Sequence, residues 1–166
     1  MTPAYIALGS NLQEPENQLC AAVVAVQNLP GSHIESISSV YRSAAVGPGT
    51  QPDYLNAVLL LATTLEPLTL LDALQQIERD QGRVRSLRWA ARTLDLDILL
   101  YGDRKIDTAR LTIPHPAMHQ RNFVLYPLAE ISDLNFMLPD GSVLGTLVAQ
   151  CAADDLVKTD LQLDNK

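Results

Sequence analysis

Hydrophobic and polar positions repeat with two different periods along the chain, and each change of period marks a new element. Residues 4–10 alternate weakly, as a strand does. Residues 15–29 have helical spacing, begin with a proline and acidic residues, and stop at a Pro-Gly pair. Residues 33–43 are rich in strand formers, and residues 44–52 hold two Pro and two Gly, which is typical of a loop.

The same two patterns return in the middle of the chain. Residues 53–65 predict a buried strand, and residues 67–83 predict an amphipathic helix that ends near a glycine. A polar loop over 84–92 leads into a second hydrophobic strand over 93–102. The order strand, helix, strand, strand, helix, strand indicates an α/β (α+β) fold, the ferredoxin-like βαββαβ sandwich.

The remaining chain adds smaller elements to this sandwich. We expect a short strand over 105–107, an extra helix from about 116 to 131 and a hairpin over 137–144. Residues from about 152 to 166 are acidic with little periodicity and predict a frayed tail. The length fits one domain, which we place over residues 1–166.

Composition narrows the class of protein. The chain is 47% hydrophobic and carries a net charge of -7, so a nucleic-acid-coating surface is not expected. Neither a signal peptide nor a membrane-spanning run is visible, and we expect a cytoplasmic monomer without membrane contact. Cys20 and Cys151 predict two reduced core thiols, with a disulfide or zinc site as the lesser alternative.

The strand over 93–102 has an unusual feature, because it carries two carboxylates, Asp95 and Asp97. Residues two apart on a strand share one face, so these side chains lie about 7 Å apart along the chain. Leu94, Leu96 and Ile98 then take the opposite face. Two like charges side by side repel and favour a cation between them.

Arginines cluster directly before these aspartates. Five of the chain's 12 Lys and Arg residues fall at positions 79, 83, 85, 88 and 92, and Trp89 lies among them. Arginine binds phosphate in a bidentate manner, and Mg²⁺ prefers one or two carboxylates together with phosphate oxygens. The combination favours phosphoryl-transfer chemistry over the alternative of a half-exposed strand beside a solvated charged loop.

Two further segments carry candidate ligand-binding residues. Tyr54 and Asn56 are two apart and can face a flat heterocycle together, although an exposed tyrosine and a strand-capping asparagine are a plainer interpretation. His115 and His119 have a spacing that permits zinc, but no third ligand is near in sequence. Phosphate contact is the better interpretation of His115. No phosphate-binding glycine motif of the usual kinds is present.

Four ordered segments, YIALGSNL, GPGTQPDYLNAV, RWAARTLDLDILLYG and IPHPAMHQRNFVLYPLAEI, resemble the 6-hydroxymethyl-7,8-dihydropterin pyrophosphokinase family of folate biosynthesis. The likeness runs from about Tyr5 to Gly141. It implies a ferredoxin-like fold and an enzyme that moves the pyrophosphoryl group of ATP to the pterin's hydroxymethyl oxygen, releasing AMP. It also implies two Mg²⁺ ions, with ATP and the pterin as small-molecule substrates.

The resemblance assigns site residues position by position. Asp95 and Asp97 match the Mg²⁺ ligands, while Arg83, Arg92 and Trp89 match a loop that closes over the triphosphate. The residues matching the ATP-binding set are Gln75, Glu78, Arg110, Thr112, His115 and Arg121. Those matching the pterin pocket are Ser43, Val46, Tyr54, Asn56 and Phe123.

The chain departs from the family's pattern in the arginine-rich loop, and two other classes of protein remain open. Ala90 and Ala91 stand where the family usually has Gly and Pro, and the loop is about one residue shorter, which leaves the roles of Arg85 and Arg88 open. A nucleotidyltransferase also pairs a Gly-Ser turn with a D-x-D strand, although it would release pyrophosphate. A non-catalytic ferredoxin-like regulatory module would consume no ATP.

Overall fold

A six-stranded antiparallel sheet forms the centre of the protein, which the computed structural model describes at residues 1–11, 14–44, 53–81 and 94–163. Its strands are β1 (Thr2–Ser10), β2 (Ser32–Ile37), β3 (Ser39–Ser43), β4 (Tyr54–Thr63), β5 (Asp95–Tyr101) and β8 (Val157–Gln162). The strand order is β5-β1-β4-β3-β8, and β2 pairs with β4 alongside β3. If β2 and β3 are taken as one interrupted strand, this is the predicted ferredoxin-like arrangement with β8 added at one edge.

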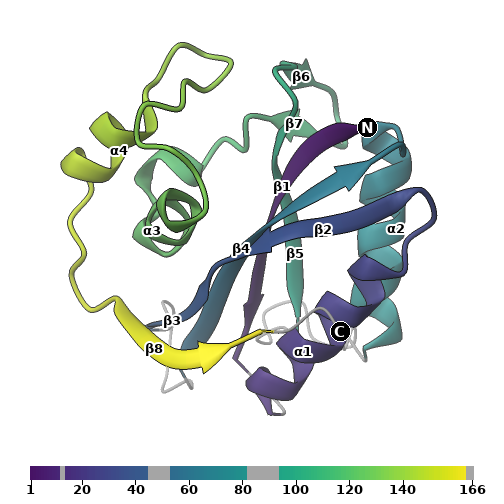
Figure 1. The fold of residues 1–166 in the computed structure, drawn as a ribbon, viewed down its shortest axis with the longest axis horizontal. Helices are drawn as coiled ribbons and strands as arrows, with labels where there is room; N and C mark the ends of the chain where they lie inside the picture. The colour runs from purple at the N-terminus through teal and green to yellow at the C-terminus, as the bar shows by residue number, and fades with distance from the viewer. Residues whose placement is uncertain (12–13, 45–52, 82–93, 164–166) are drawn as a thin grey trace.

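Helices lie on both sides of this sheet (Figure 1). The two predicted helices, α1 (Pro15–Gln27) and α2 (Pro67–Asp80), pack together on one face. The additional helices are α3 (Asn122–Glu130), α4 (Leu144–Gln150) and the 3₁₀ turn η1 (Met118–Gln120), and α3 packs against β3 and β4 from the other side. In the described part of the chain, no helix combines the length and hydrophobicity needed to cross a membrane.

Alternation along the strands produces two separate hydrophobic cores. On β1, Ala4, Ile6 and Leu8 are buried with α1 and α2, whereas Tyr5 and Ala7 pack on the side of α3 and α4. The period of two therefore divides each central strand between the two layers, as expected for a sheet covered on both faces.

The structure splits one predicted strand in two. Residues 33–43 form β2 and β3, and the break lies at Ser38, which is 1% exposed. The Ser38 hydroxyl accepts a hydrogen bond from the Val58 amide and donates one to the Ser39 carbonyl. The interruption is therefore supported by polar contacts that periodicity does not reveal.

Two expectations about the second half of the chain were wrong. The extra helix begins at Asn122 rather than near residue 116, because residues 118–120 form a 3₁₀ turn first. The C-terminal segment is not frayed up to Gln162, because β8 pairs with β3 from Ser39 to Arg42. The charged residues of this segment point outward from an edge strand, which hides its strand character in the sequence.

Some smaller features of the structure also differ from those predicted from the sequence. The short strand β6 (Ile106–Asp107) was predicted, but its partner β7 (Thr112–Ile113) was not. Both cysteines are free, and Cys20 is exposed on α1, so the prediction of two core thiols was wrong for that residue. The predicted hairpin is present as a bridge between Met137 and Val143.

Leu163→Ala tests whether the C-terminal strand belongs to the core. Leu163 is 8% exposed within the main hydrophobic cluster, so its truncation should lower the free energy of unfolding by about 2–3 kcal/mol. Leu134, which is 54% exposed, is the matched control, and its alanine variant should stay within about 0.5 kcal/mol of wild type. Urea unfolding measures both. Equal stability of the two variants would mean that the segment contributes nothing to folding.

Candidate active site

The two predicted carboxylates lie on the same face of β5. Leu94, Leu96 and Ile98 are buried in the core beside α1 and α2, while Asp95 and Asp97 are partly exposed and line one cavity on the other face. The prediction that these aspartates share one face of a strand is confirmed. The hydrophobic side chains decide this orientation, since reversing it would bury two charges in an apolar core.

Small residues on β1 leave space beside these carboxylates. The pairing register sets Asp95 opposite Gly9 and Asp97 opposite Ala7. On its other side Gly9 is opposite Asn56 of β4. A Cβ atom at Gly9 would make ordinary van der Waals contact with the Asn56 side-chain oxygen at 3.5 Å and would occupy part of the floor between Asp95 and Asn56.

The cavity above this floor measures about 270 Å³. It is lined by Ser43, Tyr54, Asn56 and Phe123, together with Asp95 and Asp97, among other residues. Asn56 is 5% exposed and is held in place because its amide group donates to the Ser43 hydroxyl at 2.8 Å. A flat ligand in this space would meet two aromatic rings and one carboxamide.

A second cavity of about 420 Å³ adjoins the first. Asp97 and His115 line both cavities. Five of the six residues matched to the ATP-binding set lie here: Gln75, Glu78, Arg110, Thr112 and His115. Two ligands that occupied the two cavities would therefore both reach the same carboxylate and imidazole.

The arginine of the second cavity is held by an acidic partner that the sequence analysis did not identify. Arg110 forms an ion pair with Asp72 of α2 at 2.5 Å and a longer hydrogen bond with Gln75 at 3.4 Å. Asp72 lies one helical turn before Gln75, so spacing along α2 could have indicated it. Since Arg110 and Asp72 are both about half exposed, this pair orients the guanidinium more than it stabilises the fold.

Glu78 supports the strand that carries the aspartates. It is 4% exposed, and its carboxylate accepts a hydrogen bond from the Leu96 amide at 2.8 Å. That amide lies between Asp95 and Asp97. A residue matched to nucleotide binding thus also fixes the peptide from which both candidate metal ligands project.

His115 has a defined protonation pattern. Its Nδ1 accepts a hydrogen bond from the Ala117 amide at 3.2 Å, so the neutral ring carries its proton on Nε2. Burial lowers the pKa of His115, and the charge of Arg121 lowers it further, while Asp97 acts in the opposite direction. The net effect favours the neutral ring near pH 7.

His119 and Arg121 are close in sequence but have different surroundings. Arg121 lines the first cavity, and its guanidinium carbon lies 5.6 Å from the centre of the Phe123 ring. His119 instead contacts Asp140 at 2.7 Å. The spacing of His115 and His119 therefore does not translate into a shared ligand pair.

The described residues contain no cluster of three or more His, Cys, Asp or Glu side chains able to hold a metal by themselves. The paired carboxylates fit Mg²⁺, which takes one or two carboxylates and completes its shell with water and phosphate oxygens. Val46, Arg83, Trp89 and Arg92 lie outside the described residues.

Fold and site together define a ferredoxin-like α+β domain in which two cavities meet at Asp97, one of the paired carboxylates, and at His115. The chain matches the family described as 7,8-dihydro-6-hydroxymethylpterin-pyrophosphokinase (HPPK) over residues 5–133, and it belongs to that family.

Curated relatives support the assignment over nearly the whole chain. The chain is 52% identical to 2-amino-4-hydroxy-6-hydroxymethyldihydropteridine pyrophosphokinase of Haemophilus influenzae, covering 95% of this chain and 98% of the relative. It is also 52% identical to the protein of the same name from Pseudomonas aeruginosa, covering 89% and 90% of the two chains.

Solved structures show the same fold at low sequence identity. HPPK-DHPS of Plasmodium falciparum, in the wild-type crystal structure with SDX-DHP, is 14% identical and superposes with a TM-score of 0.70. The alignment covers 90% of this chain and 43% of that chain, so the present chain spans less than half of the longer protein.

The environment of His115 predicts how stability depends on pH. Because its pKa is lowered on folding, the folded protein binds fewer protons than the unfolded chain below about pH 6.5. Its contribution to stability is complete above that pH and is lost as the pH falls. Wild type should therefore lose more unfolding free energy than His115→Asn between about pH 7.5 and 5.5. Urea unfolding at both pH values measures this, and parallel losses would contradict it.

Proposed function

We propose that the protein transfers the pyrophosphoryl group of ATP to the hydroxymethyl oxygen of 6-hydroxymethyl-7,8-dihydropterin and releases AMP, in folate biosynthesis. One observation carries the proposal for this site: two cavities of different lining meet at Asp97 and His115 in a chain of this family. A group can be transferred between two substrates only when both are held in line at one point.

The first cavity is the proposed pterin pocket. Tyr54 and Phe123 provide aromatic faces for a flat ring, and Asn56 provides a carboxamide held in position by Ser43. Ring stacking of this kind contributes about 0.5–1.5 kcal/mol per aromatic contact beyond area burial. Val46 is assigned to the same pocket on the family pattern alone.

The second cavity is the proposed ATP site. Arg110 and His115 are its candidate hydrogen-bond donors to the phosphates. Arg121, which lines the neighbouring cavity, is a third. Gln75, Glu78 and Thr112 complete the polar lining. Arg83, Arg92 and Trp89 are assigned to a loop that covers the triphosphate, by the family pattern.

Asp95 and Asp97 would hold Mg²⁺, with two ions as the family pattern implies. Bound there, the metal would supply positive charge to the transferring phosphates and orient their oxygens. The protein's own part is to present both carboxylates from one rigid strand, beside a floor of small residues. Removing a carboxylate should therefore affect chemistry more than folding.

In the proposed transfer, the pterin hydroxyl oxygen forms a bond to the β-phosphorus of ATP. The bond between that phosphorus and the oxygen bridging to the α-phosphorus breaks, AMP leaves, and the hydroxyl proton passes to solvent. Neutral His115, with its proton on Nε2, donates a hydrogen bond to a phosphate oxygen without adding a proton-dependent charge. Closing the site against water would prevent hydrolysis of ATP.

The experiment that tests the function supplies ATP, the dihydropterin and Mg²⁺ and measures AMP. AMP formation that depends on the pterin supports the proposal. Pyrophosphate release instead would assign the protein to nucleotidyl transfer, and no ATP consumption would indicate a regulatory module.

Asp97→Ala should abolish most activity without loss of folding. In metal-free buffer its unfolding free energy should equal or exceed that of wild type, because one of two like charges is removed. Asp160→Ala, at an exposed site on β8, is the control and should retain wild-type activity. Activity assays and urea unfolding compare the three proteins. Wild-type activity in Asp97→Ala would refute the assignment of Asp97.

Arg110→Ala should weaken ATP binding about tenfold, the effect of about 1.4 kcal/mol from lost charged hydrogen bonds. Arg79→Ala is the matched control, because Arg79 is exposed on α2 and hydrogen-bonded to Gln76 on the same helix. Titration with a non-hydrolysable ATP analogue measures both affinities. Similar losses in the two variants would show that net charge, and not the site, is responsible.

A further inference from the structure

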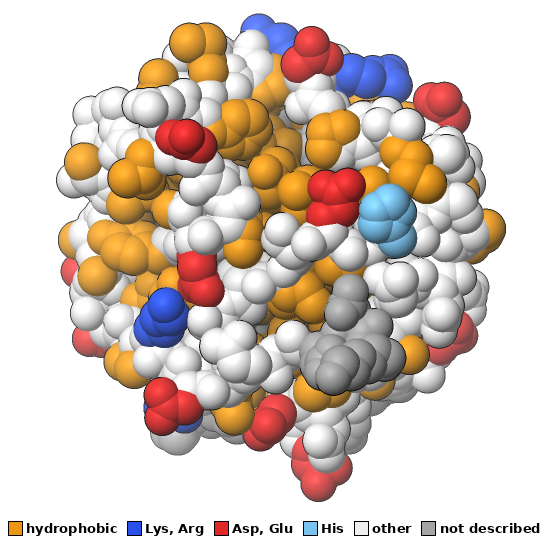
Figure 2. Space-filling model, in the orientation of Figure 1, with side chains coloured by type: hydrophobic (Ala, Val, Ile, Leu, Met, Phe, Trp, Pro, Cys, Tyr) orange, Lys and Arg blue, Asp and Glu red, His pale blue; other side chains and the backbone are white. Residues whose placement is uncertain are grey.

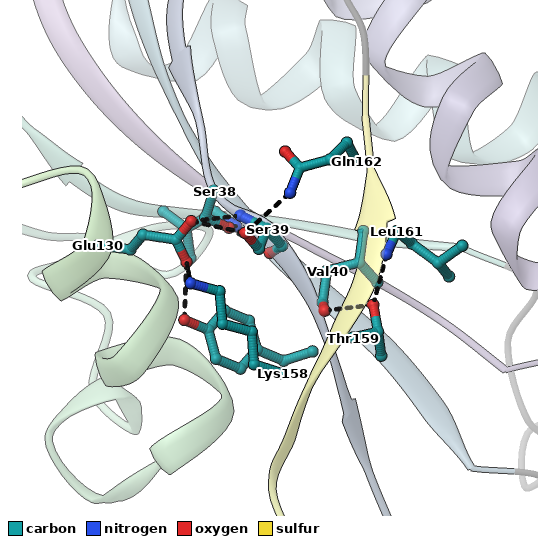
Figure 3. A network of polar contacts seen from close by, with 10 residues as sticks. Ser38, Ser39, Val40, Glu130, Lys158, Thr159, Leu161 and Gln162 are labelled. Atoms are coloured by element: carbon teal, nitrogen blue, oxygen red, sulfur yellow. Dashed lines mark hydrogen bonds and ion pairs between the residues drawn. The ribbon is translucent and has the colours of Figure 1, made fainter.

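The carboxylate of Glu130 connects three elements that are far apart in sequence. Glu130 is the last residue of α3, and Figure 3 shows its side chain directed from that helix toward Ser39 and Lys158. One oxygen accepts from the Ser39 amide at 2.9 Å and from its hydroxyl at 2.8 Å. The other accepts from the Tyr41 hydroxyl at 2.7 Å.

Most of this network is shielded from water. Ser39 and Tyr41 are 4% and 7% exposed, and the Glu130 side chain is 26% exposed. Burial works against the charge of Glu130, but the bonds from Tyr41 and Ser39 outweigh it and lower the pKa of the carboxyl. Lys158 is peripheral, because it is 57% exposed and 3.9 Å away.

The two elements joined by Glu130 also form the walls of the proposed pterin pocket. Phe123 is the second residue of α3, and Glu130 is the last, about 10 Å further along the helix axis. On β3, Ser39 is the first residue and Ser43, which holds Asn56, is the last. Helix and strand are therefore joined at one end and face the pocket at the other.

A second contact brings the network closer to the pocket. Tyr41 binds Glu130 through its hydroxyl, while its backbone carbonyl accepts the Asn56 amide at 3.5 Å. The same residue is thus in contact with both the helix and the carboxamide that we assign to pterin recognition. A shift of Tyr41 would move Asn56 relative to Phe123.

We propose that Glu130 is a positioning residue for the pterin pocket. It sets the separation between Phe123 on α3 and Asn56 on β4 by tying α3 to β3. This inference rests on the pterin pocket proposed above. Glu130 is not among the described residues that line that pocket, so it acts through its hydrogen bonds with Ser39 and Tyr41.

Glu130→Gln is the informative variant, because it keeps the size of the side chain. Its amide oxygen can still accept from Ser39, but its NH₂ group replaces the acceptor for Tyr41. With a non-hydrolysable ATP analogue present, the pterin dissociation constant should rise about five- to tenfold. The affinity for the ATP analogue should stay within about twofold, because Ser39, Tyr41 and Glu130 are not among the described residues that line the second cavity. Glu130→Ala should raise the pterin dissociation constant more than Glu130→Gln does, because it removes both acceptor oxygens.

Two controls separate positioning from a general loss of stability. Val26→Ala removes a fully buried side chain of α1 on the opposite face of the sheet, so it should lower stability without changing pterin affinity. Lys158→Ala removes only the exposed ion pair and should stay within about twofold of wild-type affinity. Tyr41→Phe removes the hydroxyl alone and should reproduce part of the rise in pterin dissociation constant seen in Glu130→Gln. It provides the test if Glu130→Gln does not fold.

The outcomes distinguish this inference from the proposed pocket. Asn56→Ala is measured in the same titration. If Asn56→Ala weakens pterin binding but Glu130→Gln and Tyr41→Phe do not, the positioning role is overturned and the pocket stands. If Asn56→Ala binds the pterin like wild type, the pocket is misplaced and the inference falls with it. A rise in pterin dissociation constant in Val26→Ala equal to that in Glu130→Gln would also overturn the positioning role.

Discussion

The alternation of side chains along β5 is the constraint on which the site depends. Burying Leu96 and Ile98 against α1 and α2 is worth about 1.5–3 kcal/mol for each side chain. With those residues inside, Asp95 and Asp97 must face the other side of the sheet. A one-residue change of register would exchange the hydrophobic side chains with the aspartates and bury two charges. Core packing therefore also determines where the carboxylates lie.

In the described part of the chain, the opposite face is only partly covered, and this leaves room for a site. Helix α3 packs on β3 and β4. Strand β1 carries Gly9 and Ala7 opposite the carboxylates of β5, the edge strand on the other side of the sheet. The first cavity remains there, and the second lies at the β5 edge of the sheet, lined by residues of α2 and of 109–116; Asp97 and His115 line both. On the face shown in Figure 2, the described acidic side chains are scattered and the basic ones do not join into one patch.

Polar residues around the cavities are held by partners before any ligand arrives. Ser43 orients Asn56, Asp72 orients Arg110, and the Ala117 amide sets the tautomer of His115. Groups fixed in advance lose less conformational freedom when a ligand binds, so more of the contact energy contributes to affinity. The same logic applies at longer range to Glu130, whose carboxylate accepts hydrogen bonds from Ser39 and Tyr41 in the network of Figure 3.

Features that depend on a local pattern of residues could be predicted from the sequence. Strand alternation predicted that Asp95 and Asp97 share a face, helical spacing predicted α1 and α2, and element order predicted the ferredoxin-like sheet. Four ordered segments of the chain were enough to indicate the family. These inferences succeed because hydrophobic burial imposes a period on neighbouring residues, and that period is readable in one dimension.

Tertiary structure decided what depends on residues distant in sequence. The break at Ser38, the pairing of β8 with β3, the partner of Arg110 and the contacts of Glu130 each join segments about 20 to 120 positions apart. In β8, the charged outer face hid a strand that only its pairing with β3 reveals. Hydrogen bonds and edge pairing leave no period in the sequence, because their energy comes from the meeting of two surfaces that only folding brings together.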